Sequence, residues 1–193
     1  MARTHRPMVD PTPAHILRVS ARAHCLYTEA EVEAALDRLA QEITAKLAES
    51  NPLLLCVMTG AVVVTGKLAT RLAFPLQIDY LHATRYRAAT SGGELVWERH
   101  PAASLAGRTV LIIDDILDEG ITLARIVEYC REQGCKRVLV AVLVNKIHDR
   151  KAPIEADFVG LDTEDYYLYG YGMDYKGYLR NAPGIYAVAP EDI

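Results

Sequence analysis

The chain has 193 residues, of which 51% are hydrophobic and 24% are charged, a composition that favours one soluble globular domain. Its net charge of −4 excludes the chain-wide basic field that would attract nucleic acid or an anionic membrane. No secretory signal or bilayer-spanning run is recognisable, since the longest apolar run, over 53–64, is interrupted and short. The four cysteines show no CxxC spacing, which argues against zinc and favours reduced thiols in a cytoplasm.

The predicted elements alternate between helix and strand. The proline-rich residues 1–12 predict a mobile arm, and Thr28 with Glu31 predicts the capped start of a helix that continues until Asn51-Pro52 stops it. Periodicity and turn residues then predict helices over 62–72 and about 121–133, and strands over 53–58, 76–83, 94–98, 109–113, 137–144, 157–161 and 185–189. This order predicts an α/β fold with a mostly parallel, twisted sheet flanked by helices, whose ligands bind beyond the carboxyl ends of the strands.

A polar segment separates two of these strands and predicts a flap. Residues 85–93 contain few apolar side chains and end in Ser-Gly-Gly, between the strands over 76–83 and 94–98. We expect this segment to be a flexible loop that closes over the ligand crevice and keeps water out.

The most informative segment runs from Thr109 to Ala124. Five residues suited to a buried strand lead directly into Asp114 and Asp115, and an acidic turn with one glycine then precedes a helix. Free N–H groups at the start of a helix favour a phosphate, and adjacent carboxylates suit sugar hydroxyls or hydrated Mg²⁺. Acidic pairs at strand ends often only cap the next helix, but the whole run in this order favours a site for a phosphorylated sugar.

Three further places could carry chemistry. The turn at Thr59 and Gly60 exposes amides that could bind an anion, although an ordinary strand–turn–helix junction explains it equally well. Lys146 is either a solvated lysine at a strand end or a donor to the exocyclic carbonyl of a purine. The tyrosine-rich stretch from Asp165 to Arg180 offers packing residues or a platform for a purine face, with a carboxylate and an arginine suited to Mg²⁺ and pyrophosphate.

The segment from Thr109 to Ala124 resembles the phosphoribosyl-pyrophosphate (PRPP) signature of the type I phosphoribosyltransferases. Asp157-Phe-Val-Gly-Leu, Tyr171-Gly-Met-Asp-Tyr and Leu179-Arg resemble the C-terminal hood of the hypoxanthine-guanine members. The resemblance implies one domain over 1–193, in which residues 157–193 form the C-terminal part of a small base-binding hood. It implies Mg²⁺-dependent transfer of a 5-phosphoribosyl group from PRPP to hypoxanthine or guanine, which gives IMP or GMP and pyrophosphate. By analogy, it also implies a homodimer or homotetramer.

The resemblance assigns roles to individual residues. Asp118 is the catalytic residue that takes the proton of the base. The implied ligands of ribose and its phosphate are Asp114, Asp115, Asp118, Glu119, Gly120, Ile121 and Thr122. The implied pyrophosphate ligands are Thr59, Gly60, Tyr86 and Arg180, the implied base ligands are Lys146, Tyr167 and Leu168, and the implied metal ligands are Asp114, Asp115 and Asp174.

This chain departs from the family pattern at three positions. Lysine often stands at the place of Thr59, serine at that of Arg85 and threonine at that of Glu119. We therefore expect backbone contacts to pyrophosphate near Thr59, and we expect the carboxylate of Glu119 to point away from the phosphate.

Two other functions remain open at this stage. One is a phosphoribosyltransferase that prefers xanthine or another base, and the other is a PRPP-sensing regulator that binds nucleic acid, which the acidic charge balance disfavours. The histidines His82, His100 and His148 lack metal-site spacing, and we expect them to have surface or packing roles.

Overall fold

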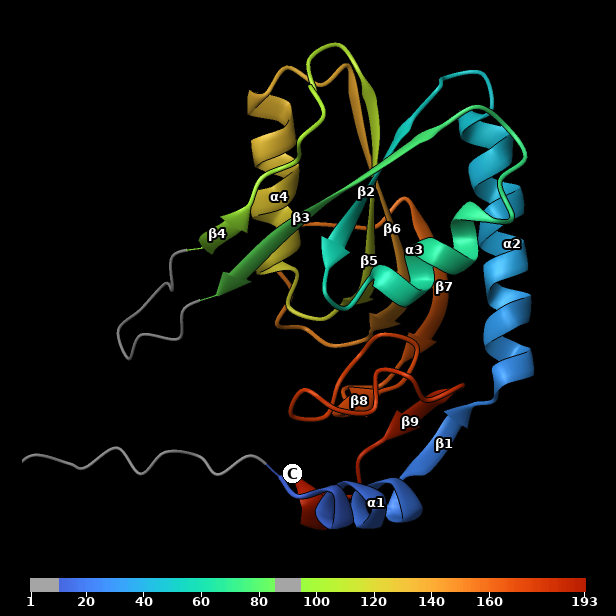
Figure 1. Cartoon of the computed structure of the whole chain (residues 1–193), viewed down its shortest axis with the longest axis vertical. Helices are drawn as coiled ribbons and strands as arrows, with labels where there is room; N and C mark the ends of the chain where they lie inside the picture. Colours follow the sequence, from blue (N-terminus) through green and yellow to red (C-terminus); the bar gives the residue numbers. More distant parts are fainter. Residues whose placement is uncertain (1–10, 86–94) are drawn as a thin grey trace, which may run out of the picture.

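The computed structural model describes residues 11–85 and 95–193, and its main feature is a six-stranded sheet in the order β4-β3-β2-β5-β6-β7 (Figure 1). The edge strand β4 runs antiparallel to β3, and the other neighbouring pairs are parallel. The strands are β2 (Leu53–Met58), β3 (Gln77–Arg85), β4 (Leu95–Arg99), β5 (Thr109–Leu117), β6 (Arg137–Lys146) and β7 (Phe158–Thr163). The expected α/β fold with a mostly parallel sheet is confirmed.

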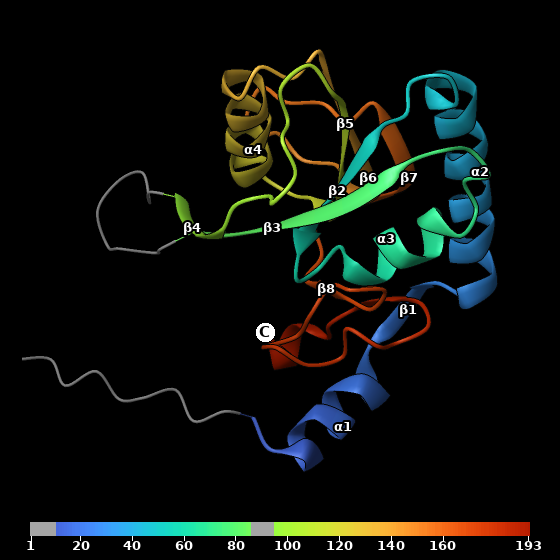
Figure 2. The same ribbon diagram turned by 45° about the horizontal axis from the view of Figure 1, so that its top comes forward.

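Helices cover both faces of this sheet. The helix α4 (Ile121–Glu132) lies on one face, and α2 (Glu29–Leu47) and α3 (Val62–Ala69) lie on the other (Figure 1, Figure 2). Covered on both sides, β2 and the first part of β5 consist of buried, mostly aliphatic residues. The predicted capping box is present at the start of α2, where Thr28 and Glu31 exchange hydrogen bonds. In the described ranges, no helix is both long enough and apolar enough to cross a membrane.

A smaller body, here called the hood (residues 13–27 and 165–192), lies beyond the carboxyl ends of the parallel strands (Figure 1). It consists of α1 (Pro13–Arg22), β1 (His24–Tyr27), β8 (Leu168–Tyr169), β9 (Ile185–Ala187) and the 3₁₀ helix η1 (Pro190–Asp192). Its antiparallel sheet has the order β1-β9-β8, and its own core contains Ile16, Val19, Tyr169, Tyr175 and Val188. The guanidinium of Arg22 donates to both oxygens of the buried Asp192 carboxylate, so segments far apart in the sequence close the hood together.

The sequence analysis does not predict the N-terminal elements of the hood, α1 and β1. Of the expected arm over 1–12, residues 1–10 lie outside the described residues, and Thr12 caps α1 by accepting the N–H of His15. Helix α1 and strand β1 are short, and β1 pairs with β9, whose sequence lies far away. Neither element therefore shows a local pattern strong enough to predict it.

Several boundaries differ from expectation by a few residues, among them the ends of β5 and α3. Strand β5 continues to Leu117 instead of ending at Ile113, because β6 pairs with it as far as Asn145. Asp114 and Asp115 consequently lie inside the strand, and the turn begins only after Leu117. Helix α3 ends at Ala69 instead of residue 72, since the chain then tightens into a turn with a hydrogen bond from the Arg71 N–H to the Leu68 carbonyl.

Candidate active site

The turn between β5 and α4 has the geometry of an anion site. Gly120, which precedes α4, has a φ of 76°, and a Cβ there would lie 2.6 Å from the side chain of Ile154. The left-handed backbone and the lack of space both require glycine. No side chain of the described residues caps this helix, so its first N–H groups remain available for a phosphate. A cavity of about 240 Å³ lies against the turn and is lined by residues 114–116 and 118–123.

Asp114 and Asp115, here called the acidic pair, line this cavity from the end of β5. Asp115 is only 8% exposed, and its N–H donates to Asp114 Oδ1 at 3.0 Å. Burial, reinforced by the charge of Asp115, raises the pKa of Asp114 well above its usual value, and burial raises the pKa of Asp115 as well. Hydroxyl hydrogens of a sugar or a divalent cation would relieve the electrostatic cost of two adjacent buried carboxylates.

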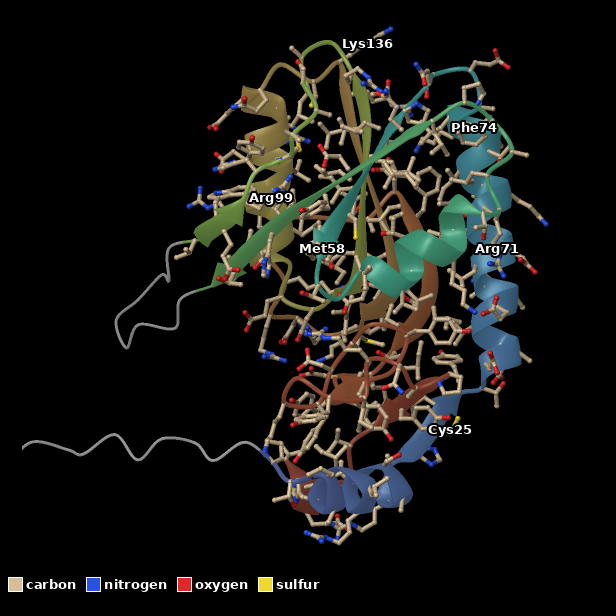
Figure 3. All side chains as sticks on the ribbon, viewed as in Figure 1. Cys25, Met58, Arg71, Phe74, Arg99 and Lys136 are labelled. Atoms are coloured by element: carbon tan, nitrogen blue, oxygen red, sulfur yellow. The ribbon has the colours of Figure 1, made fainter. Side chains whose placement is uncertain are left out.

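The turn after β2 lies between the acidic pair and the hood. Met58, which ends β2, lies at the end of the strand nearer the hood, and the Met58–Thr59 peptide bond is cis (Figure 3). A Cβ on Gly60 would lie 2.1 Å from Asp115 Oδ2, and a Cβ on Gly172 would lie 1.9 Å from the Gly60 carbonyl oxygen. Only glycine at both positions permits this packing, which brings the predicted pyrophosphate turn against the predicted ribose site.

Two predicted ligands from the hood, Arg180 and Asp174, join this group. Arg180 donates to the Gly172 carbonyl oxygen at 2.6 Å, and its charge opposes the rise in the pKa of Asp115 that burial causes. Its second nitrogen lies 2.7 Å from Asp174 Oδ1, while Asp174 Oδ2 accepts the N–H of Gly177 at 2.7 Å. The predicted pyrophosphate arginine and the predicted metal ligand are therefore paired with each other beside the acidic pair.

The predicted metal ligands, the acidic pair and Asp174, do not form one compact cluster. Within the described residues, a different set of possible ligand atoms lies within 4.8 Å of one another, those of Asp118, His148 and Asp165. The cations of Lys146 and Arg150 already neutralise the carboxylates of that set, so it is a poor site for a metal ion. The acidic pair fits Mg²⁺ better, because Mg²⁺ binds through one or two carboxylates and completes its coordination with substrate phosphates and water, whereas Asp174 is paired with Arg180 and would have to leave it to join them.

Lys146 and Asp118 meet where β6 and β5 end. Lys146 is 8% exposed, and its Nζ lies 3.1 Å from Asp118 Oδ2 and 3.4 Å from Asp165 Oδ1, so it is not a solvated surface lysine. Partial burial raises the pKa of Asp118, but the hydrogen bond from His148 and then the hydrogen bond and charge of Lys146 outweigh that effect. The pKa of Asp118 therefore falls below its usual value, and the carboxylate is ionised at neutral pH.

His148 is a site residue that the sequence does not reveal. Its side chain is 6% exposed, and its Nε2 lies 2.9 Å from Asp118 Oδ1. The expectation of a surface or packing role misses this contact with the predicted catalytic residue. The sole sequence signal is that His148 follows Lys146 by two residues, which does not specify where its ring points.

The predicted base ligands of the hood, Tyr167 and Leu168, follow closely after a residue that contacts Lys146. Asp165, which contacts Lys146, is followed closely by Tyr167 and Leu168. The ring of Tyr167 packs against Tyr175 with 5.6 Å between centroids, and Leu168 opens β8 with a buried side chain. The contact of Lys146 with Asp165 thus links the end of β6 to the segment that carries Tyr167 and Leu168.

The remaining predicted site residues are Glu119, Ile121, Thr122 and Tyr86. The carboxylate of Glu119 is 37% exposed and lies 3.8 Å from the guanidinium of Arg150, while the residue also lines the cavity. Ile121 and Thr122 form the first turn of α4. Tyr86 and the flap expected over 85–93 lie outside the described residues, apart from Arg85 at the end of β3.

Comparisons with known proteins agree with this geometry. A family model for the phosphoribosyl transferase domain matches residues 25–176. The hypoxanthine-guanine phosphoribosyltransferase of Bacillus subtilis (strain 168) is 34% identical over 166 residues, which cover 86% of this chain and 92% of that protein. The hypoxanthine-guanine-xanthine phosphoribosyltransferase of Tritrichomonas foetus is 31% identical over 161 residues, covering 83% and 88%. A solved hypoxanthine phosphoribosyltransferase from Staphylococcus aureus matches with a TM-score of 0.83 and 28% identity, covering 87% of this chain and 92% of that one.

A parallel sheet with a hood beyond its carboxyl ends and an anion turn after an acidic strand end defines a phosphoribosyltransferase of type I. The relatives narrow this class to the enzymes named for hypoxanthine and guanine, because these matches extend over most of both chains at more than 30% identity. The chain belongs to the hypoxanthine-guanine phosphoribosyltransferase family.

Proposed function

We propose that this enzyme transfers the 5-phosphoribosyl group of PRPP to a ring nitrogen of hypoxanthine or guanine, giving IMP or GMP and pyrophosphate. The observation that carries the proposal is the meeting of a buried lysine with a carboxylate at the mouth of an anion turn, Lys146 with Asp118 at 3.1 Å. This pair offers a donor for the exocyclic oxygen of a purine and an acceptor for its ring proton.

The ribose phosphate binds at the turn between β5 and α4. The N–H groups at the start of α4 donate to the terminal phosphate, and the helix dipole favours its charge. The acidic pair accepts hydrogen bonds from the two ribose hydroxyls, which offsets the cost of burying both carboxylates. These contacts fix the anomeric carbon near Asp118, which lines the same cavity.

The pyrophosphate is held on the other side of the acidic pair. Arg180 donates to its oxygens, and the amides of the turn at Thr59 and Gly60 replace the lysine that many relatives use there. The acidic pair and Asp174 would hold Mg²⁺, which when bound supplies positive charge to the departing pyrophosphate.

The base approaches from the hood side. Tyr167 supports one face of the ring, Leu168 offers backbone groups to its edge, and Lys146 leaves its carboxylates to donate to the 6-oxo group. The bond between the anomeric carbon and pyrophosphate breaks with its electron pair on the phosphate oxygen. The ring nitrogen forms the new bond, and Asp118 accepts the proton that the base loses.

The test is a turnover assay with PRPP, Mg²⁺ and hypoxanthine, guanine, xanthine or adenine, using the wild type and Asp118→Asn. Xanthine belongs in this panel because a relative is named for it. We expect turnover with hypoxanthine or guanine, and a fall in kcat of about 10²- to 10⁴-fold for Asp118→Asn with PRPP affinity retained. Turnover of xanthine alone would show that the proposed substrates are wrong. An unchanged kcat in Asp118→Asn would show that Asp118 does not accept the proton.

A further inference from the structure

The ring of His148 has a defined hydrogen-bond arrangement. Its Nδ1 accepts the backbone N–H of Arg150 at 3.2 Å, and its Nε2 lies 2.9 Å from Asp118 Oδ1. A ring nitrogen that accepts an N–H carries no proton of its own, so the proton of the neutral ring is on Nε2. His148 therefore donates to Asp118 through Nε2, and its side chain is only 6% exposed.

Asp118 has two partners that differ in what happens when a base binds. Lys146 holds Oδ2 and also contacts Asp165, whereas His148 holds Oδ1. In the proposed function, the 6-oxo group of the purine draws Lys146 away from the carboxylate. Of the two partners, His148 then remains on Asp118 and leaves Oδ2 open toward the base.

We propose that His148 is a positioning residue that keeps the Asp118 carboxylate aimed at the purine after Lys146 has turned to the 6-oxo group. This inference rests on the proposed function and adds a residue to it. A neutral donor suits the task, because it orients a carboxylate without opposing the proton that the carboxylate must accept.

The charged groups around this ring come from three segments. Asp118 and Glu119 belong to the turn after β5, and Asp165 follows β7. Lys146 ends β6 and lies against both Asp118 and Asp165, while Arg150 pairs with Asp165 and lies 3.8 Å from Glu119. Among these carboxylates, Asp118 is the one that His148 contacts in the part of the chain that the structure describes.

The test compares His148→Leu, which removes the donor, with His148→Gln, which keeps an N–H donor that does not titrate. His24→Leu is the matched control, since His24 lies exposed on β1. We expect His148→Leu to lower kcat about ten- to a hundredfold with the KM for PRPP nearly unchanged. His148→Gln should recover most of this loss, because its side-chain N–H can still donate to Asp118.

Several results would overturn the inference. A kcat in His148→Leu within about twofold of wild type would show that Asp118 needs no help from this ring. Equal losses in His148→Leu and His148→Gln, accompanied by equally lowered melting temperatures, would indicate packing alone. Nitrogen-15 NMR of the wild type gives a reading that needs no variant: we expect the Nε2–H form, and an Nδ1–H form would also refute the inference. If the wild type turns over none of the purines, the proposed function itself fails and this inference fails with it.

Discussion

Replacing Gly60 by alanine tests the packing of the two anion turns against each other. The added Cβ would lie 2.1 Å from Asp115 Oδ2 and 2.5 Å from its Cγ, whereas ordinary contacts begin at 3.4 Å. The backbone at Gly60 is not left-handed, so the whole effect comes from this overlap. Overpacking of this kind costs about 1–3 kcal/mol, which for a chain of this size lowers Tm by roughly 2–12 °C.

The strain can also be relieved by turning the Asp115 carboxylate away from the turn. In that case the protein keeps more of its stability, but the displaced carboxylate binds ribose less well. Each 1.4 kcal/mol of binding free energy lost in this way raises the Kd for PRPP about tenfold. Calorimetric melting and titration with PRPP measure the two parts separately. We expect Gly60→Ala to show a lower Tm, a higher Kd or both.

Gly66→Ala is the matched control on the next helix. Gly66 lies in α3, an added Cβ there would meet no atom within 4 Å, and alanine favours a helix over glycine by about 0.5–1 kcal/mol. This variant should melt slightly above wild type and bind PRPP equally well. The reasoning would be refuted if Gly60→Ala matched the wild type in both Tm and Kd while Gly66→Ala behaved as expected.

Two further predictions concern Lys146 and Glu33. Lys146→Ala should lower kcat/KM for hypoxanthine by about a hundredfold and reduce the preference for hypoxanthine over adenine, so an unchanged preference in the four-base assay would contradict its proposed role. The hydrogen bond from Lys67, followed by that from Tyr171, lowers the pKa of Glu33 from 4.5 to about 2. Because the folded-state pKa lies below the unfolded one, this stabilisation is complete above about pH 4.5 and is lost as the pH falls toward 2. Urea unfolding curves at about pH 5 and about pH 3 measure this effect. Between the two pH values, the free energy of unfolding of the wild type should fall by about 2 kcal/mol more than that of Glu33→Gln, and equal losses would exclude this linkage.

The sequence predicts the site best where residues are close along the chain or end neighbouring parallel strands. The run through Asp114 and Asp118 carries its own signal, since a buried strand, an acidic pair, a glycine turn and a helix follow one another without a break. Lys146 could be placed near it because β5 and β6 are parallel neighbours whose carboxyl ends meet at the same edge. These relations follow from general rules of α/β topology.

The remaining features depend on packing that no local pattern records. His148 reaches Asp118 because the chain after β6 folds back so that the Arg150 N–H meets its ring. Arg180 and Asp174 suit separate tasks in the sequence, yet their side chains lie 2.7 Å apart in the structure. Strand β1 becomes a strand only through β9, a partner that its four residues cannot specify.

The closure of the hood by residues from both ends of the chain has a consequence for folding during translation. The Arg22–Asp192 pair joins positions 170 residues apart, whereas the strands of the main sheet lie between residues 53 and 163. During translation, the sheet and its phosphate turn can assemble while α1 and β1 still wait for β9 to be synthesised. A nascent chain can therefore complete the turn after β5 before the hood can close over it.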